Sequence, residues 1–286
     1  MKVLQYDIGE NGAKLTCYVQ DASPAIDASA RRPAVLIFPG GGYEFVSDAE
    51  KECVALAYGA EGFQSFTLEY SVKEKGVFPV PQREAFAAIA FLRSHAEQLL
   101  IDPHRLAVVG FSAGGHLAAS CGVFWDDACV NLQADRRGCR PDALVLVYPC
   151  ITAGEYAYPG IVGVHGKGTA FPERLSLEHY VTKETPPAFL CHTSADTCVP
   201  SINSLLFASA LAKAGVPYEL HIYKDGPHGM SLATRAVSSP YLKTFDEGIQ
   251  RAVRDACKRF SDWFEKSVAF LRLIFDAPAD RAGDPF

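Results

Sequence analysis

The stretch RLAVVGFSAGGHLAASCGVFW, residues 105–125, decides the fold of this chain. Its apolar start at 106–109 predicts a short buried strand, and from His116 onward apolar residues recur at helical spacing. Between the two, Gly-Phe-Ser-Ala-Gly at 110–114 matches the G-x-S-x-G pattern of a sharp turn with a nucleophilic serine at its apex. We expect glycine at both ends of this pattern because a Cβ at either place would clash within so tight a turn.

Such a turn would give Ser112 a particular chemical environment. It lifts the serine Oγ clear of the sheet and points the amide N–H of Ala113, at the positive end of the following helix, toward the same spot. The plainer alternative is a glycine-rich turn of a doubly wound sheet whose serine does no chemistry, because short patterns also arise by chance. The segments on either side of the turn must therefore decide between the two interpretations.

A second apolar strand at 34–38 runs into a glycine-rich loop, Pro-Gly-Gly-Gly-Tyr at 39–43. Consecutive glycines lose extra backbone entropy on folding, so we expect this backbone to approach a ligand closely. A flexible turn or a phosphate loop are the alternatives, but the glycine spacing of a phosphate loop is absent. The predicted oxyanion hole near Ser112 comprises three backbone amides, those of Gly41, Gly42 and Ala113.

The rest of the pattern predicts an α/β fold. Residues 2–9 and 13–20 alternate around a turn and favour an N-terminal antiparallel hairpin. Strands and helices then alternate, which indicates a mostly parallel doubly wound sheet with helices on both faces, in a single domain spanning 1–286. The helices we expect include 48–60, capped by Ser47, one that runs from 81 to 99, and a long amphipathic one at 247–275.

Two segments lie outside this alternation. The forty residues at 148–187 carry Gly, Pro and aromatic residues with little periodicity, so they are either a lid over the serine or an ordered surface excursion. The tail at 277–286 is expected to fray.

The composition limits the classes of partner and cofactor that we expect this protein to bind. A net charge of -6 gives no basic footprint for nucleic acid or an anionic membrane. The first residues lack the apolar region of a signal peptide, and nine cysteines without a CxxC pair argue for reduced thiols, so we expect a cytoplasmic protein with no disulfide framework and no zinc site. We expect no metal or cofactor, and the oligomeric state is left open.

A serine hydroxyl needs a base to become nucleophilic, and the base needs an acid to orient it. Of the eight histidines, His228 alone lies in the loop after the last predicted strand, while Asp196 follows the strand before it. Both therefore belong at the carboxyl edge of the sheet, where Ser112 already points. Asp225 is the rival acid, but it is only three residues from His228 on the same loop. We expect activity to rise with pH as His228 loses its proton.

The chain resembles the esterase and lipase branch of the α/β-hydrolase superfamily, and more narrowly the bacterial acetyl esterases of the acetylxylan-esterase-like group. The resemblance rests on four segments, FPGGGY at 38–43, VGFSAGGHLAA at 109–119, TPPAFLCHTSAD at 185–196 and GPHG at 226–229. It implies that Ser112 is the nucleophile, His228 the base and Asp196 its orienting acid, with the oxyanion hole as above. One departure is Pro39, where lipase-like relatives have histidine.

The resulting expectation is a serine carboxylesterase that hydrolyses short-chain acyl esters through an acyl-enzyme. By resemblance, its small-molecule ester substrate could be an acetylated xylo-oligosaccharide. Tyr43 and Phe111, which flank the glycine loop and the serine, are the candidate substrate-binding residues. Two alternatives remain: an amide-cleaving hydrolase of formamidase or peptidase type on the same three residues, and a catalytically silent hydrolase fold that only binds.

Overall fold

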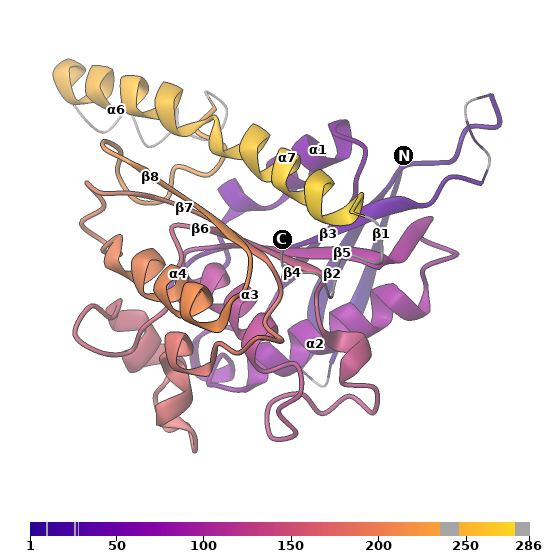
Figure 1. Ribbon diagram of the computed structural model, residues 1–286, viewed down its shortest axis with the longest axis horizontal. Coiled ribbons are helices and arrows are strands. Elements are labelled where there is room, and N and C mark those ends of the chain that lie inside the picture. Colours follow the sequence, from indigo (N-terminus) through magenta and orange to yellow (C-terminus); the bar gives the residue numbers. More distant parts are fainter. Residues whose placement is uncertain (10, 26, 28, 235–245, 278–286) are drawn as a thin grey trace.

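The computed structural model describes residues 1–9, 11–25, 27, 29–234 and 246–277. Its centre is one eight-stranded sheet in the order β1-β2-β4-β3-β5-β6-β7-β8 (Figure 1). The strands are Lys2–Ile8 (β1), Ala13–Val19 (β2), Arg32–Phe38 (β3), Gln64–Glu69 (β4), Ile101–Phe111 (β5), Ala143–Val147 (β6), Ala188–Thr193 (β7) and Tyr218–Tyr223 (β8).

Strand pairing confirms the predicted fold class. β1 and β2 form the antiparallel hairpin, and β2 pairs antiparallel with β4. From β4 to β8 every pairing is parallel. In a parallel sheet all strands end at the same edge, so the loops after β3, β5, β7 and β8 gather there.

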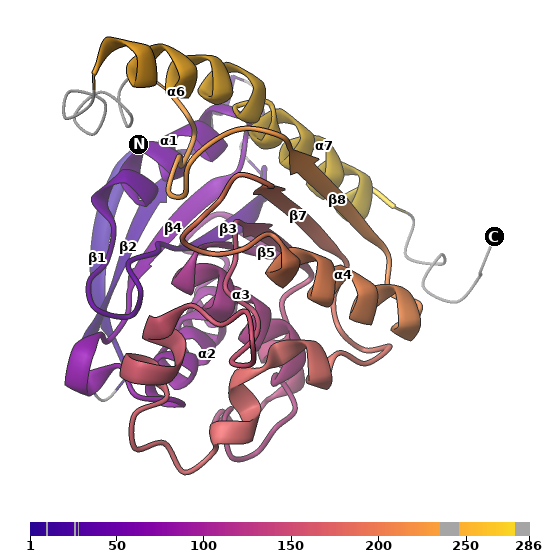
Figure 2. The ribbon, with the colours of Figure 1, turned by 90° about the vertical axis from the view of Figure 1, so that its left-hand side faces the viewer.

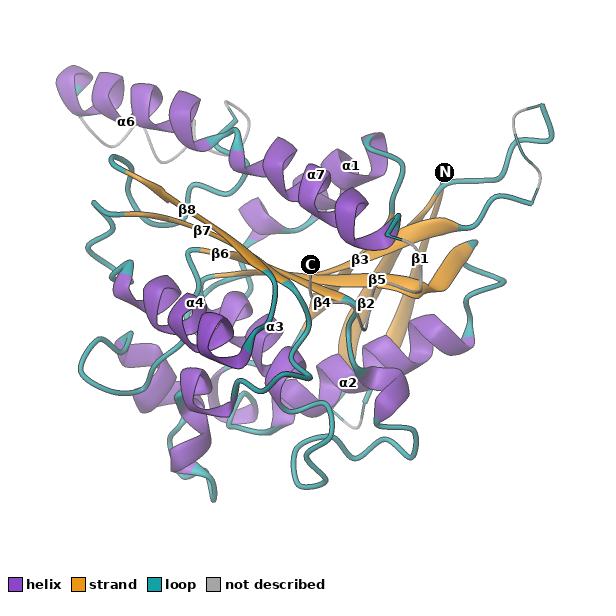
Figure 3. Cartoon of the chain, in the orientation of Figure 1, coloured by secondary structure: helices purple, strands orange, loops and turns teal. Residues whose placement is uncertain are grey.

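Helices cover both faces of the sheet (Figures 2 and 3). The α-helices are Glu52–Ala60 (α1), Val80–Ser94 (α2), Ala113–Val123 (α3), Ile202–Ala214 (α4), Glu247–Phe260 (α6) and Trp263–Phe275 (α7). α2, α3 and α4 pack on one face, and α1, α6 and α7 lie on the other (Figure 1). Two hydrophobic cores result, one on each side of the sheet, and most of their members are fully buried. Both faces of β3 and β5 are therefore covered, as their unbroken apolar sequences predict.

Three expected helices differ in detail. The helix expected at 48–60 is a 3-10 turn, Asp48–Glu50, followed by α1, and Ser47 makes no side-chain cap. The helix expected from 81 to 99 ends at Ser94. The helix expected at 247–275 is two helices with a break at Ser261 and Asp262.

The two larger differences have tertiary causes. Glu50 turns inward to bond Gly40 and Tyr148, which interrupts the first helix. The Asp262 carboxylate accepts a hydrogen bond from the Tyr223 hydroxyl at the end of β8, which fixes the chain between α6 and α7. Except for Ala277, the tail predicted to fray lies outside the described residues.

Residues 148–187, the segment predicted to be a lid or a surface excursion, are irregular with three short helical turns, Ile161–His165, Pro172–Leu175 and Leu177–Tyr180. Among the described residues, no helix is long and apolar enough to cross a membrane.

Candidate active site

The turn between β5 and α3 has the geometry that its glycines predict. Ser112 stands at its apex with φ 53° and ψ −117°, a strained conformation for a residue with a side chain. A Cβ on Gly110 would lie 2.2 Å from the Gly114 carbonyl oxygen, and one on Gly114 would lie 2.1 Å from the Phe38 oxygen. Glycine is thus required at both positions, because α3 can approach β3 and β5 only without these side chains.

The serine is anchored on both sides. Its N–H donates to the Val147 carbonyl (3.1 Å), and its own carbonyl accepts from Cys150 N–H (3.0 Å). The strained backbone is therefore held by the neighbouring strand β6 and by the loop that follows it. The Ser112 side chain keeps a small exposed area, since the residue is 7% exposed.

The structure brings the three predicted catalytic side chains together from three loops. Ser112 Oγ lies 2.8 Å from His228 Nε2, and His228 Nδ1 lies 2.6 Å from Asp196 Oδ2. Because the carboxylate can only accept, Nδ1 carries the ring proton, and Nε2 is left with the lone pair that faces the serine hydroxyl. The arrangement can therefore take a proton from Ser112 and hold the resulting imidazolium against a carboxylate.

Asp196 is fully satisfied as a buried carboxylate. Its Oδ1 accepts from the N–H groups of Cys198 and Val199, each at 2.9 Å. Its Oδ2 faces His228 and also His192 Nε2, at 3.4 Å. Burial alone would raise the pKa of Asp196, but the hydrogen bonds from His192 and His228 hold it well below its usual range. Asp196 is thus ionised at neutral pH.

His192 is a residue that the sequence analysis did not assign to the site. It is completely buried on β7, with Nδ1 2.8 Å from Ser204 Oγ and Nε2 2.9 Å from the Val199 carbonyl. Since Nε2 faces two acceptors it carries the proton, and Nδ1 accepts from the serine. The one signal in the sequence is its position four residues before Asp196.

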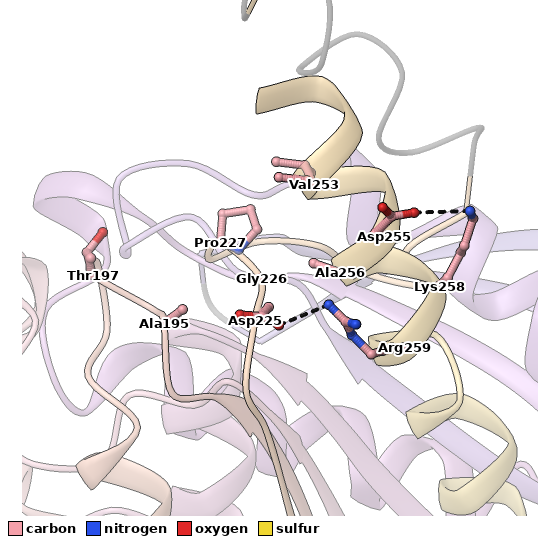
Figure 4. Close-up of a pocket in the computed structure, with 11 residues that line it drawn as sticks. Ala195, Thr197, Asp225, Gly226, Pro227, Val253, Asp255, Ala256, Lys258 and Arg259 are labelled. Atoms are coloured by element: carbon pink, nitrogen blue, oxygen red, sulfur yellow. Dashed lines mark hydrogen bonds and ion pairs between the residues drawn. The ribbon is translucent and has the colours of Figure 1, made fainter. Parts of the chain in front are cut away.

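Asp225, the rival acid, lies elsewhere. Its carboxylate pairs with Arg259 of α6 at 2.9 Å, and both side chains are exposed (Figure 4). The pair lines an open cavity of about 720 Å³ between α6 and the loops that carry Asp196 and His228, but neither of these two residues lines it. The structure therefore leaves Asp196 as the acid in contact with His228.

The glycine loop after β3 presents free amides beside the serine. Gly40 N–H is already bonded to Glu50 Oε2 at 2.7 Å. In the part of the chain that the structure describes, the next two amides make no hydrogen bond, and neither does the first amide of α3. The unbonded donors are the three predicted ones, those of Gly41, Gly42 and Ala113.

The irregular segment after β6 packs directly on this loop. A Cβ on Gly42 would lie 3.0 Å from the Tyr158 hydroxyl, and one on Gly160 would lie 2.6 Å from the Gly42 carbonyl oxygen. The start of the segment is tied to α4, because Asn203 Oδ1 accepts from the N–H groups of Ile151 and Thr152. Part of the segment predicted to be a lid or a surface excursion thus packs against the glycine loop.

Two predicted substrate-binding side chains point away from the site. Tyr43 is completely buried, because the left-handed backbone at Gly42 and at Tyr43 itself turns the ring inward. Its hydroxyl bonds His116 Nδ1 (3.1 Å), and its ring stacks on His165 at 3.7 Å. A substrate cannot touch this ring, so the prediction for Tyr43 needs correction.

Phe111 is also completely buried, on the opposite face of the sheet. Phe111 is the last residue of β5, and its ring packs in the core beneath α6 and α7, where its centroid lies 5.8 Å from that of the Trp263 ring. The prediction of substrate contact is corrected here as well, since alternation along the strand directs this side chain into the core.

The chain is similar to known proteins along most of its length. A family model described as BD-FAE matches residues 18–144, and a model of the prolyl oligopeptidase family matches residues 153–245. Two curated relatives are an endo-1,4-β-xylanase B from Butyrivibrio fibrisolvens, 35% identical over 71% of this chain, and an acetylxylan esterase from Xylanibacter ruminicola, 25% identical over 82%. The chain spans only 33% and 47% of the length of these two proteins.

Two solved structures match over nearly their whole length. An acetyl ester-xyloside bifunctional hydrolase from Caldicellulosiruptor lactoaceticus is 35% identical, with a TM-score of 0.73 over 92% of this chain and 89% of its own. MGS-M1, an α/β-hydrolase enzyme from a Medee basin deep-sea metagenome library, is 36% identical, with a TM-score of 0.75 over 96% of this chain and 98% of its own. These likenesses confirm the predicted resemblance: the chain belongs to the α/β-hydrolase family.

Proposed function

We propose that this chain is a serine carboxylesterase that hydrolyses esters of short acyl groups. The observation that carries the proposal is the unbroken chain of hydrogen bonds from Ser112 Oγ through the His228 ring to the buried Asp196 carboxylate. Relatives named as acetylxylan esterase and acetyl ester hydrolase support the ester as the bond that is cleaved.

The reaction proceeds in two acyl transfers. Ser112 Oγ attacks the ester carbonyl carbon while His228 Nε2 takes the hydroxyl proton, and the carbonyl oxygen becomes an oxyanion. The bond to the alcohol then breaks, and His228 returns the proton to the departing alkoxide. Water repeats the sequence on the acyl-enzyme, which releases the acid and the free serine. Asp196 stays ionised throughout and stabilises the imidazolium in each transition state.

The oxyanion forms where free backbone donors meet. Gly41 and Gly42 follow Gly40, whose Cβ position lies 3.0 Å from Ser112 Cβ, and Ala113 follows Ser112 directly. Among the described residues, none accepts a hydrogen bond from the amides of Gly41, Gly42 or Ala113. Donors that are already in place cost no reorganisation when the charge develops, and one such donor contributes roughly 10²–10³ in rate. Because Glu50 occupies the Gly40 amide, Gly40 is not one of these donors.

We propose acetylated xylo-oligosaccharides as the natural substrates. The support comes from the printed names of relatives, an acetylxylan esterase and a hydrolase of acetyl esters and xylosides. Tyr158 and Gly160 pack closely against Gly42 of the glycine loop. This packing leaves little room beside the loop and favours a small acyl group.

The test is hydrolysis of p-nitrophenyl acetate, butyrate and octanoate by the wild-type protein and by Ser112→Ala. We expect activity to fall with acyl length and to vanish in the variant, whereas Ser94→Ala, an exposed serine at the end of α2, should retain it. A Ser112→Ala variant as active as wild type would refute the proposal.

A second candidate is amide cleavage, because the prolyl oligopeptidase model matches the part of the chain that contains Asp196 and His228. The same assay with p-nitroanilides of acetate and of short peptides separates the two. An esterase hydrolyses the esters and leaves the anilides almost untouched. Hydrolysis of the anilides at a comparable rate would favour the amidase. A protein that cleaves neither the esters nor the anilides would support the remaining alternative, a catalytically silent hydrolase fold that only binds.

A further inference from the structure

A buried glutamate lies directly beneath the site and belongs to no part of the mechanism described so far. Glu50 is 3% exposed at the end of the 3-10 turn before α1. Its Oε2 accepts from Gly40 N–H at 2.7 Å, and its Oε1 accepts from the Tyr148 hydroxyl at 2.7 Å. A Cβ added to Gly40 would meet Glu50 Oε2 at 2.8 Å and Ser112 Cβ at 3.0 Å. A single glycine therefore separates this carboxylate from the nucleophile.

The other partner of Glu50 leads to the catalytic histidine. Tyr148 is 1% exposed, and its ring lies edge-on against the His228 ring with centroids 4.9 Å apart. Its hydroxyl also accepts from Ser231 N–H at 2.8 Å, in the loop that carries His228. Ser231 Oγ in turn donates to the carbonyl of Ala49, the residue next to Glu50, at 2.6 Å. These contacts close a ring of hydrogen bonds.

The donors around Glu50 favour its ionised form. Each of its oxygens faces a donor, Gly40 N–H on one side and the Tyr148 hydroxyl on the other. A proton on Oε1 would displace the hydrogen bond that this oxygen accepts from the Tyr148 hydroxyl. Burial raises the pKa of Glu50 above its usual value, and the hydrogen bonds from Tyr148, Gly40 and the Ser47 side chain, with the nearby His228, limit that rise.

We infer that Glu50 is a positioning residue for the proposed esterase, whose carboxylate couples the glycine loop to His228 through Tyr148. Through Gly40 it fixes the start of the loop that offers the oxyanion donors. Through the hydroxyl and ring of Tyr148 it orients His228, and its charge stabilises the imidazolium formed in the transition state. The inference rests on the proposed function and adds a second buried anion to that of Asp196.

Other titratable groups around Glu50 do not supply this charge. Burial raises the pKa of Tyr148, of Tyr70 and of Cys53, so all three side chains stay neutral in the range where esterases work. The carboxylate in direct contact with His228 is Asp196, with His192 behind it. A change at Glu50 therefore removes a charge near His228 and leaves the contacts of Asp196 with His228 and His192 intact.

The test compares two matched pairs of variants with p-nitrophenyl acetate over pH 5–9. Glu50→Gln keeps the shape but turns an amide NH₂ toward either Gly40 N–H or the Tyr148 hydroxyl. Its control is Glu84→Gln, because Glu84 is another buried glutamate that accepts from one backbone N–H and one hydroxyl, both of Ser71. Tyr148→Phe removes one hydroxyl, and its control is Tyr58→Phe, whose buried hydroxyl bonds Ser267 far from the site.

We expect Glu50→Gln to lower kcat about 10–100-fold with KM nearly unchanged, because the anchoring of the glycine loop at Gly40 and a charge near His228 are affected together. The acid limb of the kcat/KM profile should move to lower pH by about one unit, since an anion that favours the imidazolium has gone. Tyr148→Phe should lower kcat by roughly 3–10-fold. The double variant, Glu50→Gln with Tyr148→Phe, should lose less kcat than the product of the two single losses, because both substitutions act through the contact between Glu50 and Tyr148.

Thermal unfolding of the four single variants and of the double variant separates a fold defect from a catalytic one. A Glu50→Gln variant whose pH profile coincides with wild type, or whose loss matches that of Glu84→Gln, would overturn the inference. If the wild-type protein hydrolyses no ester while Ser112 still reacts with a fluorophosphonate, the proposed substrate class fails instead, and the rate of that labelling at each pH tests Glu50 by itself.

Discussion

Replacing Asp196 by asparagine tests the hydrogen-bond chain with almost no change in shape. The carboxylate has two different sides, since Oδ1 accepts from Cys198 and Val199 N–H while Oδ2 accepts from His228. An amide oxygen in the Oδ1 position keeps both backbone bonds, whereas the flipped amide loses both at a cost of about 1–3 kcal/mol for each buried donor. The new NH₂ group therefore faces His228.

That orientation reverses the tautomer of the histidine. Nδ1 now meets a donor, so it takes the lone pair, and the ring proton moves to Nε2, which can no longer accept the proton of Ser112. The imidazolium also loses its counter-ion. Both effects together should lower kcat/KM for p-nitrophenyl acetate about 10³–10⁴-fold, which corresponds to about 4–5 kcal/mol of transition-state stabilisation.

The assay is kcat/KM at pH 8 for Asp196→Asn beside Asp225→Asn. Asp225 is exposed and paired with Arg259, so its variant should stay within about twofold of wild type. A loss smaller than tenfold in Asp196→Asn, or a larger loss in Asp225→Asn, would refute the assignment of the acid.

Three further predictions follow from packing. Gly114→Ala places a Cβ 2.1 Å from the Phe38 carbonyl oxygen, so p-nitrophenyl acetate hydrolysis should fall more than roughly 100-fold with a lowered Tm; unchanged activity would contradict the elbow geometry. Burial lowers the pKa of His116 to about 4, and that of His165 well below its usual value. The unfolded chain protonates these histidines near pH 6.5, so their contribution to the free energy of unfolding is complete above that pH and is lost as the pH falls toward 4. For His116 alone we expect a loss of about 3 kcal/mol, measured by urea unfolding at each pH. A free energy of unfolding that does not change with pH would contradict this. Tyr43→Phe leaves His116 Nδ1 without its partner and should cost about 1–3 kcal/mol of stability, while KM stays within about twofold; a large rise in KM would restore Tyr43 as a substrate contact.

The contacts of the three predicted catalytic side chains could be predicted because they follow from strand order. Ser112, Asp196 and His228 each lie in the connection that follows a strand of the parallel sheet, and such strands end at one edge. The glycines at 110 and 114 also predicted the tight turn at Ser112, because a Cβ at either position would clash with the backbone. Loop positions that are tied to strand ends can be placed from sequence alone.

The residues that were missed depend on contacts between distant segments. Glu50 looks like a solvated helix residue, and only the position of Gly40 and Tyr148, 98 residues further on, shows that it points inward. Tyr43 was misplaced because the direction of a side chain after three glycines depends on left-handed backbone angles that composition does not specify. The break between α6 and α7 likewise depends on Tyr223, a partner 39 residues away from Asp262.

The central claim is that Ser112 is the nucleophile, and covalent labelling tests it most directly. A fluorophosphonate should lose fluoride to the serine Oγ, and peptide mass spectrometry should place a single stoichiometric adduct on the peptide that contains Ser112. We predict that the adduct disappears in Ser112→Ala and forms far more slowly in His228→Ala. An adduct on another residue, or equal labelling of the Ser112→Ala variant, would contradict the account.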